Sequence, residues 1–201
     1  MIVSNVEQLS QEWFAEKAGL PSASSFGKIL TPTGLPSKSK VDLMYRLAGE
    51  KILESKVETY QSAAMANGVI MEETARTVYE IKNNVEVTQI GLAYFDERKD
   101  RGCSPDGLIE SSGGLEIKCP EIHTHVRYLL DGKLPTNYIP QIQGSLYVTG
   151  LEWWDFMSYY PGLNPLIIRV ERDEAYIMKL DVQLNIFVLE LNETVERLKA
   201  L

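Results

Sequence analysis

The stretch that most constrains the fold is residues 107–120, GLIESSGGLEIKCP, which has the pattern of a β-hairpin. Two short apolar-rich runs flank SSGG, a sequence typical of a turn, and Pro120 ends the second run. Because side chains alternate along a strand, the apolar residues of the second run are expected to face a core. Glu116 and Lys118 then share the opposite face, where they need water, a partner or a metal.

Asp106 stands just before this hairpin, which is expected to fold it back near Glu116. Two neighbouring carboxylates repel each other, and one of them is pushed toward protonation. A divalent cation removes that cost, because hard cations prefer carboxylate oxygens. Lys118, beside them, can orient a water or stabilise charge on a phosphate. Together the three residues supply what metal-assisted phosphodiester hydrolysis needs. The alternative is a hairpin with ordinary exposed charges.

The remaining chain alternates amphipathic and strand-like segments. Helices are expected at 5–18, around Phe26, and at 41–56, 63–82, 122–131, 138–149 and 173–199. Strands are expected at 85–90, 92–95, 107–110, 115–119, 153–160 and 166–173. This order predicts an α/β fold, in which helices flank a central mixed β-sheet. The sequence has no repeat and no long linker, so a single domain over 1–201 is expected.

Charge and cysteine content indicate which partners and which cellular compartment to expect. The net charge of −8 argues against a uniformly basic, nucleic-acid-coating protein. Residues 17–56 nevertheless carry seven Lys or Arg against three Asp or Glu, a local charge of +4 that leaves about −12 elsewhere. Such a zone suits a protein that grips a polyanion in one place, although solvated helix faces are the alternative. Cys103 and Cys119 are expected to be free thiols in a reducing cytoplasm, with a disulfide across the hairpin as the alternative. No membrane segment is expected.

Five segments, in order, resemble the YqaJ-like viral recombinase family of phage lambda exonuclease-like proteins, within the PD-(D/E)XK nuclease superfamily. The central segment is SPDGL…GGLEIKCP, and EWFAEKAGLPSASSFGKIL and ANGVIMEETARTVYE precede it. The segments CPEIHTHVRYLLDGKLPTNYIPQIQGSLYVTG and EWWDFMSYYP follow it. The resemblance implies a restriction-endonuclease-like core across one nuclease domain.

The resemblance also implies roles for individual residues. The implied metal ligands are Asp106, Glu116, Glu72 and the backbone carbonyl of Ile117. Lys118 and Gln143 are implied to act in catalysis, Gln143 as the active-site member of a Q-x3-Y pair with Tyr147. The implied pocket for a DNA 5′ phosphate consists of Lys17, Ser22, Ser24 and Ser104, with lysine at 17 where the best-known member has arginine. His125 is a further candidate near the site, and zinc binding by His123 and His125 is a weaker alternative.

The implied activity is 5′-to-3′ exonuclease digestion of double-stranded DNA ends, which releases 5′-mononucleotides and leaves 3′ single-stranded overhangs for recombination by strand annealing. The implied cofactor is Mg²⁺, or Mn²⁺, with one or two ions per site. A homotrimeric ring, a single-strand annealing partner and a phage- or prophage-encoded protein in the bacterial cytoplasm are implied as well. Alternatives are a structure- or sequence-selective endonuclease with the same core, and a DNA-binding protein without catalysis.

Overall fold

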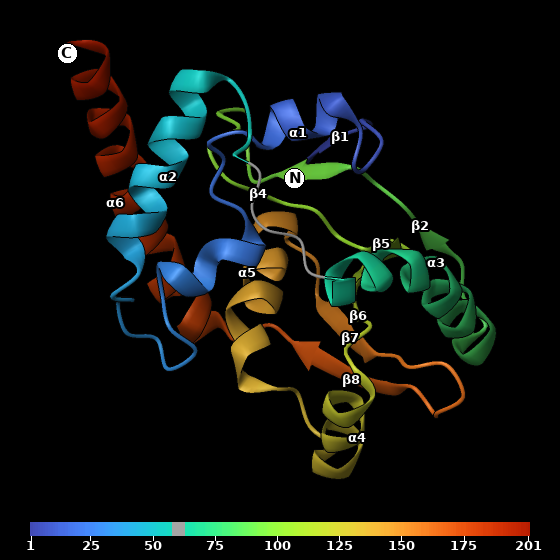
Figure 1. The fold of residues 1–201 in the computed structure, drawn as a ribbon. Helices are drawn as coiled ribbons and strands as arrows, with labels where there is room; N and C mark the ends of the chain where they lie inside the picture. The colour runs from blue at the N-terminus through green and yellow to red at the C-terminus, as the bar shows by residue number, and fades with distance from the viewer. Residues whose placement is uncertain (58–62) are drawn as a thin grey trace.

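The computed structural model describes the backbone of residues 1–57 and 63–201, and side chains for 1–57 and 70–201 (Figure 1). The α-helices are α1 (Gln11–Lys17), α2 (Lys40–Leu53), α3 (Ala63–Asn83), α4 (Ile122–Asp131), α5 (Ile139–Thr149) and α6 (Glu174–Lys199). Two 3₁₀ helices are η1 (Ala23–Lys28) and η2 (Thr136–Tyr138). The strands are β1 (Ile2–Ser4), β2 (Val87–Thr88), β3 (Leu92–Tyr94), β4 (Gly102–Cys103), β5 (Gly107–Ile109), β6 (Gly113–Lys118), β7 (Trp153–Ser158) and β8 (Leu166–Glu171).

The main sheet has the strand order β2-β5-β6-β7-β8. Strands β5 and β6 form the predicted hairpin, in which Gly107 pairs with Leu115 and Ile109 with Gly113. Strands β6 and β7 are parallel, and the other neighbours in this sheet are antiparallel. A parallel pair needs a crossover, which α4 and α5 provide. The predicted mixed sheet flanked by helices is therefore confirmed.

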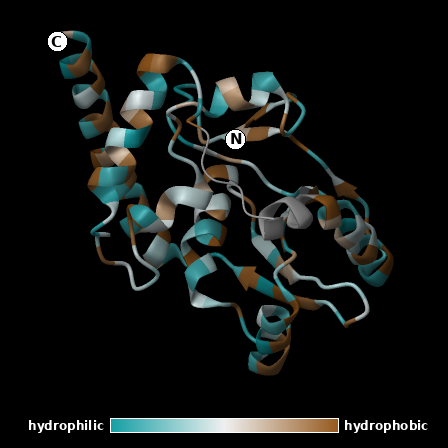
Figure 2. Ribbon diagram, in the orientation of Figure 1, coloured by the Kyte–Doolittle hydropathy of each residue, from teal (hydrophilic) through white to brown (hydrophobic). Residues whose placement is uncertain are grey.

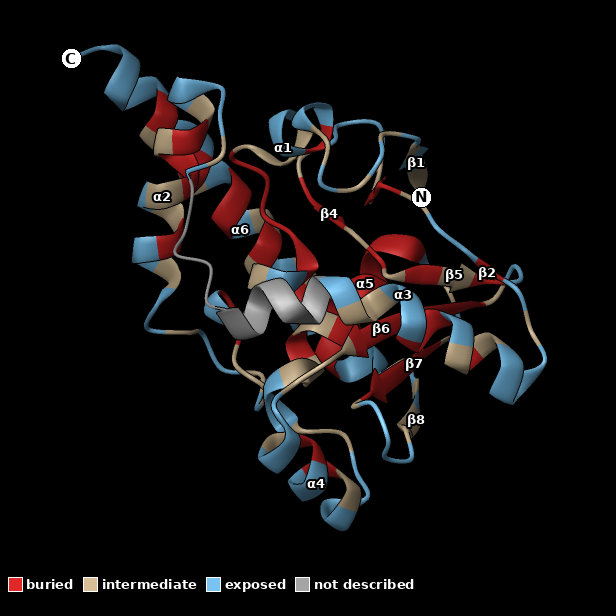
Figure 3. Ribbon diagram, turned by 45° about the vertical axis from the view of Figure 1, so that its right-hand side comes forward, coloured by how far each residue is buried: buried red, intermediate tan, exposed pale blue. Residues whose placement is uncertain are grey.

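The two faces of this sheet pack against different helices. On one face, Leu115, Ile117 and Met157 contact the α3 residues Ala75 and Tyr79. On the other face, side chains of β7 pack against α5, with α2 and α6 lying side by side behind it (Figure 1). Figure 3 shows the buried residues of β6, β7 and α5 gathered between these layers. The predicted apolar face of β6 thus lies under α3, and Glu116 points to the α5 side.

A smaller sheet, in the order β1-β3-β4, carries the N-terminal segment next to α1. Strands β1 and β4 were not predicted, because two or three residues are too few to show a periodicity. The helix predicted at 5–18 is wrong in its first half. Leu9 has a left-handed backbone (φ 67°), and the helix begins only after Ser10, whose side chain accepts a hydrogen bond from the Trp13 amide.

Helix amphipathicity explains the outer layer. Figure 2 shows α2 and α6 as alternating hydrophobic and hydrophilic bands, as expected for helices that bury one side. The buried side of α6 includes Leu180, Leu184, Phe187 and Leu191, spaced three or four residues apart. In the part of the chain that is described, we found no helix with both the length and the apolarity needed to cross a bilayer.

One glycine brings the N-terminal serines to the main sheet. Gly144 lies on α5 where η1 crosses it, and a Cβ at this position would overlap the ring of Phe26. The absence of a side chain therefore lets η1 approach α5 closely. This contact places Ser24 of η1 beside residues of β6, although the two lie about ninety positions apart in sequence.

Candidate active site

A cavity of about 170 Å³ lies where α1, η1, β6 and α5 meet. It brings together six residues predicted from the sequence: Lys17, Ser24, Ser104, Asp106, Glu116 and Lys118. A larger cavity of about 720 Å³ shares Gln8 with it and is bordered by Glu72 and Arg76. The two cavities therefore adjoin at Gln8; Asp106 and Glu116 line the smaller one, and Glu72 lines the larger one.

Three residues of the hairpin form the polar centre of the smaller cavity. The Asp106 Oδ2 atom accepts a hydrogen bond of 2.6 Å from the backbone amide of Ile117, which fixes the aspartate against β6. Lys118 Nζ donates to Glu116 Oε1, and the glutamate is only 2% exposed. The hairpin thus returns Asp106 to Glu116 and Lys118, as the sequence pattern predicts.

Burial dominates the electrostatics of these carboxyls. It raises the pKa of Glu116 to about 7; Lys118 opposes the rise, and the charges of Asp106 and Glu72 add to it. Burial also raises the pKa of Asp106, against the opposing effects of Lys118 and of the Ile117 amide. Although burial disfavours its charged form, the negative charges of Glu116 and Asp106 raise the pKa of Lys118. The lysine is therefore a permanent cation beside carboxyls that are costly to ionise.

Glu72 joins this group from α3. Burial and the charge of Asp106 raise its pKa to about 7, and Arg76 opposes the rise. Its Oε1 atom accepts a hydrogen bond of 2.7 Å from Arg76 Nη2, in an i,i+4 ion pair. Glu72 thus forms an ion pair along α3 and at the same time borders the larger cavity.

The donor types fit a hard divalent cation. Asp106, Glu116 and Glu72 bring three carboxylates, against two neighbouring cations, Lys118 and Arg76, so full ionisation leaves an excess negative charge. A proton or a metal ion relieves that excess, which the raised pKa values express. Among the described side chains, no three acidic, imidazole or thiol groups already converge at metal-binding distance. Any cation would therefore need these carboxylates to move together, or would use a backbone carbonyl as a ligand.

A cationic corner adjoins the carboxylates. The Lys17 ammonium lies 4.0 Å from the centre of the Trp13 ring, and the Lys56 ammonium lies 5.4 Å from the same ring. Burial and then the charge of Lys56 lower the pKa of Lys17 to about 8. Two cations held on one aromatic ring destabilise each other, so this corner favours an anion.

Serine hydroxyls surround the same corner. Trp13 Nε1 donates hydrogen bonds to Ser104 Oγ at 3.1 Å and to the Gly91 carbonyl at 2.9 Å. The hydroxyls of Ser22, which precedes η1, and of Ser24 in its first turn lie 3.2 Å apart. Ser24 and Ser104 line the cavity, whereas Ser22 is buried just behind it. Lys17, Ser24 and Ser104 thus come together as predicted, with Ser22 as a neighbour that supports Ser24.

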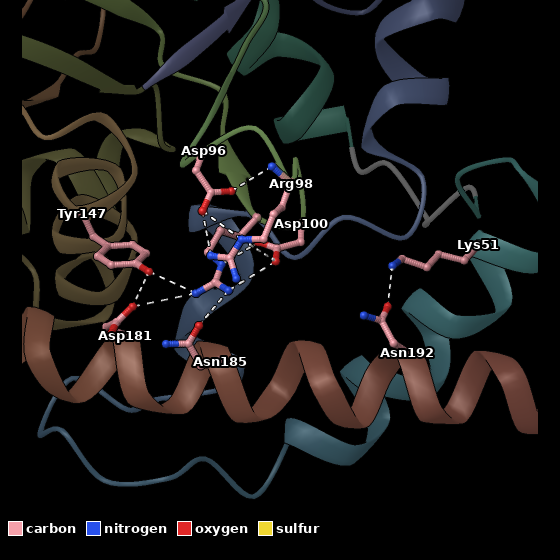
Figure 4. Close-up of polar contacts among 9 residues, drawn as sticks. Lys51, Asp96, Arg98, Asp100, Tyr147, Asp181, Asn185 and Asn192 are labelled. Carbon is pink, nitrogen blue, oxygen red and sulfur yellow. Dashed lines mark hydrogen bonds and ion pairs between the residues drawn. The ribbon is translucent and has the colours of Figure 1, made fainter.

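The prediction that Gln143 lines the active site is wrong. Its Nε2 atom donates to the Glu171 carbonyl at 2.8 Å, and its Oε1 atom accepts from the Asp173 amide at 2.9 Å. Both ends of the amide are therefore used to hold the junction of β8 and α6. Tyr147, four residues later, also points away from the cavity. Its hydroxyl donates to Asp181 at 2.6 Å and accepts from Arg101 at 3.1 Å (Figure 4).

Gln141 occupies the place expected for Gln143. Its Nε2 atom donates a 2.5 Å hydrogen bond to Glu116 Oε1, and its side chain lines the cavity together with Ser145 one turn later. The sequence holds two glutamines two positions apart, and the spacing to Tyr147 selected the wrong one. A helix-face signal was not available, because α5 is buried on almost every side.

His125 is fully buried rather than placed in the cavity. Its Nε2 atom lies 3.1 Å from the Asn164 carbonyl, an acceptor only, so Nε2 carries the proton and Nδ1 accepts from Ser158 Oγ at 2.8 Å. The expectation of a site role for His125 is therefore not supported by its position. His123 is exposed on α4, and the zinc alternative finds no ligand cluster among the described residues. Cys103 and Cys119 are free thiols, as expected.

Known proteins share this sequence and fold. Residues 12–152 match the YqaJ-like viral recombinase domain. The uncharacterized protein R354 of Acanthamoeba polyphaga mimivirus is 28% identical over 173 residues, which cover 78% of this chain. The chain spans about 30% of the length of that relative.

Solved structures agree with this assignment. LHK-Exo, an alkaline exonuclease from Laribacter hongkongensis, superimposes with a TM-score of 0.86 at 33% identity, over 95% of this chain and 97% of its own. The same enzyme has been crystallised with dAMP. A phage-related exonuclease from Haemophilus somnus 129PT shares the fold, with a TM-score of 0.67 at 13% identity over 89% and 96% of the two chains. Because the domain match covers most of its length, the chain belongs to the YqaJ-like viral recombinase domain family.

Proposed function

We propose that the protein is a divalent-cation-dependent deoxyribonuclease that digests double-stranded DNA from its 5′ ends. The observation that carries the proposal is one cavity in which Asp106, Glu116 and Lys118 lie beside the anion-favouring corner of Lys17, Ser24 and Ser104. Such an arrangement can hold a terminal phosphate next to the group that hydrolyses the adjoining phosphodiester. The similarity to LHK-Exo, an alkaline exonuclease bound to dAMP in one structure, supports the same chemistry.

In this proposal Asp106, Glu116, Glu72 and the Ile117 carbonyl bind Mg²⁺ or Mn²⁺, as one or two ions. When bound, such an ion activates a water and stabilises the leaving 3′ oxygen. Lys118 is kept protonated by its neighbours, so it orients the attacking water and stabilises charge on the phosphate rather than accepting a proton. Gln141 holds the Glu116 carboxylate by its hydrogen bond, so it takes the role first assigned to Gln143.

The remaining residues of the cavity position the substrate. Lys17 and the hydroxyls of Ser24 and Ser104 bind the 5′ phosphate of the DNA end, and Ser22 supports the hydroxyl of Ser24 from behind. Lysine lacks the two-pronged geometry of arginine, and Lys56 on the same ring supplies additional positive charge at this corner. Cleavage at the next phosphodiester then releases a 5′-mononucleotide and exposes a new 5′ phosphate, which leaves a 3′ single-stranded overhang.

The proposal extends to the biological setting. We infer a role in recombination by strand annealing, with a homotrimeric ring around the DNA and a single-strand annealing protein that receives the overhang. We further infer one nuclease domain over residues 1–201, encoded by a phage or prophage and active in the bacterial cytoplasm. The family membership supports these inferences, and light scattering that gives a monomer of 22.7 kDa would argue against the ring.

A comparison of DNA substrates tests the proposal. Linear duplexes with 5′-phosphate or 5′-hydroxyl ends are incubated with and without Mg²⁺, alongside a covalently closed circle. We expect Mg²⁺-dependent release of mononucleotides from the linear DNA, faster from phosphorylated ends, and an intact circle. Cutting of the circle would favour the alternative, a structure- or sequence-selective endonuclease. Loss of Mg²⁺ dependence would remove the metal site from the mechanism.

A further inference from the structure

Arg76 lies on α3 one turn after Glu72, and its side chain is buried among groups from three segments. Its Nη2 atom donates to Glu72 Oε1 at 2.7 Å, and its Nε atom donates to the backbone carbonyl of Asp106 at 3.1 Å. The hydrogen-bonding pattern assigns the Gln89 amide with its oxygen toward Arg76, where it accepts from Nη1 and Nη2 at 3.0 Å each. Arg76 therefore links α3 to Asp106, the residue directly before β5.

The guanidinium is anchored independently of Glu72. An arginine has five N–H donors in a fixed plane, and Asp106 and Gln89 together accept from all three of its nitrogens. The plane therefore stays in place when Glu72 turns away. The Glu72 side chain, in contrast, is 27% exposed at the border of the larger cavity. Within the described residues, its carboxylate has Arg76 as its only hydrogen-bond partner. Glu72 is thus the movable member of the pair.

The carboxylate of Glu72 is attracted by one neighbour and repelled by another. On one side, Arg76 attracts its carboxylate; on the other, the carboxyl of Asp106 repels it, strongly enough to help raise its pKa to about 7. A divalent cation bound by Asp106 and Glu116 would reverse that repulsion and attract Glu72 toward the hairpin. Arg76 occupies Oε1 of this carboxylate, and its positive charge repels a cation bound to the same group, so the ion pair and the cation compete for Glu72.

We propose that Arg76 is a positioning residue that holds Glu72 in an internal ion pair, for which a divalent cation at Asp106 and Glu116 must compete. This inference rests on the proposed metal site. The guanidinium stabilises the cation-free protein by balancing the crowded carboxylates. For the same reason it weakens cation binding, so the site exchanges its ions more readily than three unpaired carboxylates would.

Two substitutions test the competition in the full-length protein. Arg76→Met removes the charge at similar length, and Arg76→Lys keeps the charge but cannot reach all three partners at once. We expect calorimetry with Mn²⁺ to show a Kd about tenfold tighter for Arg76→Met, about 1.4 kcal/mol, with Arg76→Lys in between. We expect the Tm of the cation-free protein to fall for Arg76→Lys and to fall further for Arg76→Met. Mg²⁺ should restore the Tm most in Arg76→Met. The matched control is Arg98→Met, which removes an exposed guanidinium paired with Asp96.

The outcomes separate this inference from the proposed function. Equal or weaker Mn²⁺ binding by Arg76→Met, with binding retained by the wild type, would overturn the inference and leave the metal site intact. No binding by the wild type would remove the metal site itself, and the inference with it. If Arg76→Met folds only with Mn²⁺, the competition is supported. If it does not fold in either condition, the Kd of Arg76→Lys against the wild type decides.

Discussion

The pH dependence of stability offers a quantitative test of the carboxylate cluster, with Glu116→Gln as the perturbation. In the cation-free protein the pKa of Glu116 is raised from 4.5 to about 7, chiefly by burial. The folded protein therefore holds this proton more tightly than the unfolded chain does. The associated stability is fully present below pH 4.5 and is lost as the pH rises through about 7. Each pKa unit corresponds to about 1.4 kcal/mol, so the loss amounts to about 3 kcal/mol.

The assay is urea denaturation of the wild type and of Glu116→Gln in EDTA, at intervals from pH 4.5 to pH 8. Glutamine mimics the protonated side chain at every pH. The difference in the free energy of unfolding should therefore shift in favour of the variant by about 3 kcal/mol across this range. Glu152→Gln, at an exposed position before β7, is the matched control. Saturating Mg²⁺ should suppress the shift, because the cation replaces the proton.

A difference between wild type and Glu116→Gln that stays constant over this pH range would contradict the raised pKa of Glu116. It would mean that the carboxyl ionises as easily in the folded protein as in the unfolded chain. In that event, the close contact with Lys118 would fully offset burial, and the ionised carboxyl of Glu116 would be stable without a metal.

Three further predictions concern positions around the cavity. Gln141→Leu should lower kcat with little change in Tm. Gln143→Leu leaves backbone groups unpaired, so it should lower the free energy of unfolding by about 1–3 kcal/mol with kcat preserved. Steady-state kinetics and melting curves compare the two variants. Lys17→Met should abolish the preference for 5′-phosphate over 5′-hydroxyl ends, with Lys38→Met as the exposed control, in the end-labelled digestion assay. Gly144→Ala should cost about 1–3 kcal/mol by overpacking α5 against η1, measured by chemical denaturation.

The centre of the fold follows from local sequence pattern. The β5–β6 hairpin was predictable because apolar residues alternate with Glu116 and Lys118, and because SSGG indicates a turn; its serines lie in the turn, and its two glycines begin β6. The same alternation placed both side chains on one face and returned Asp106 to them. These features depend only on the two strands and the turn between them, so they can be predicted without knowledge of the tertiary contacts.

The errors arise where tertiary contacts decide. α5 is almost wholly buried, so no polar face distinguishes Gln141 from Gln143, and only packing against Glu116 shows which one reaches the cavity. The helix predicted from residue 5 begins at residue 11, because the left-handed backbone of Leu9 interrupts it and Ser10 caps the helix that follows. Sequence spacing can pair Arg76 only with Glu72, four residues earlier, whereas the contact of Arg76 with Asp106 depends on how α3 docks on the sheet.

The most direct test of the proposed nuclease is a time course of 3′-labelled linear duplex with 5′-phosphate ends, with wild type and with Lys118→Ala. Lys118→Ala leaves the carboxylates in place and removes the cation that contacts Glu116. We predict that the wild type, only with Mg²⁺, shortens the 3′-labelled strand progressively from its 5′ end, so that the label stays on ever shorter fragments, and that Lys118→Ala is slower by about a hundredfold or more. Digestion by Lys118→Ala at the wild-type rate, or by the wild type in EDTA, would contradict the account.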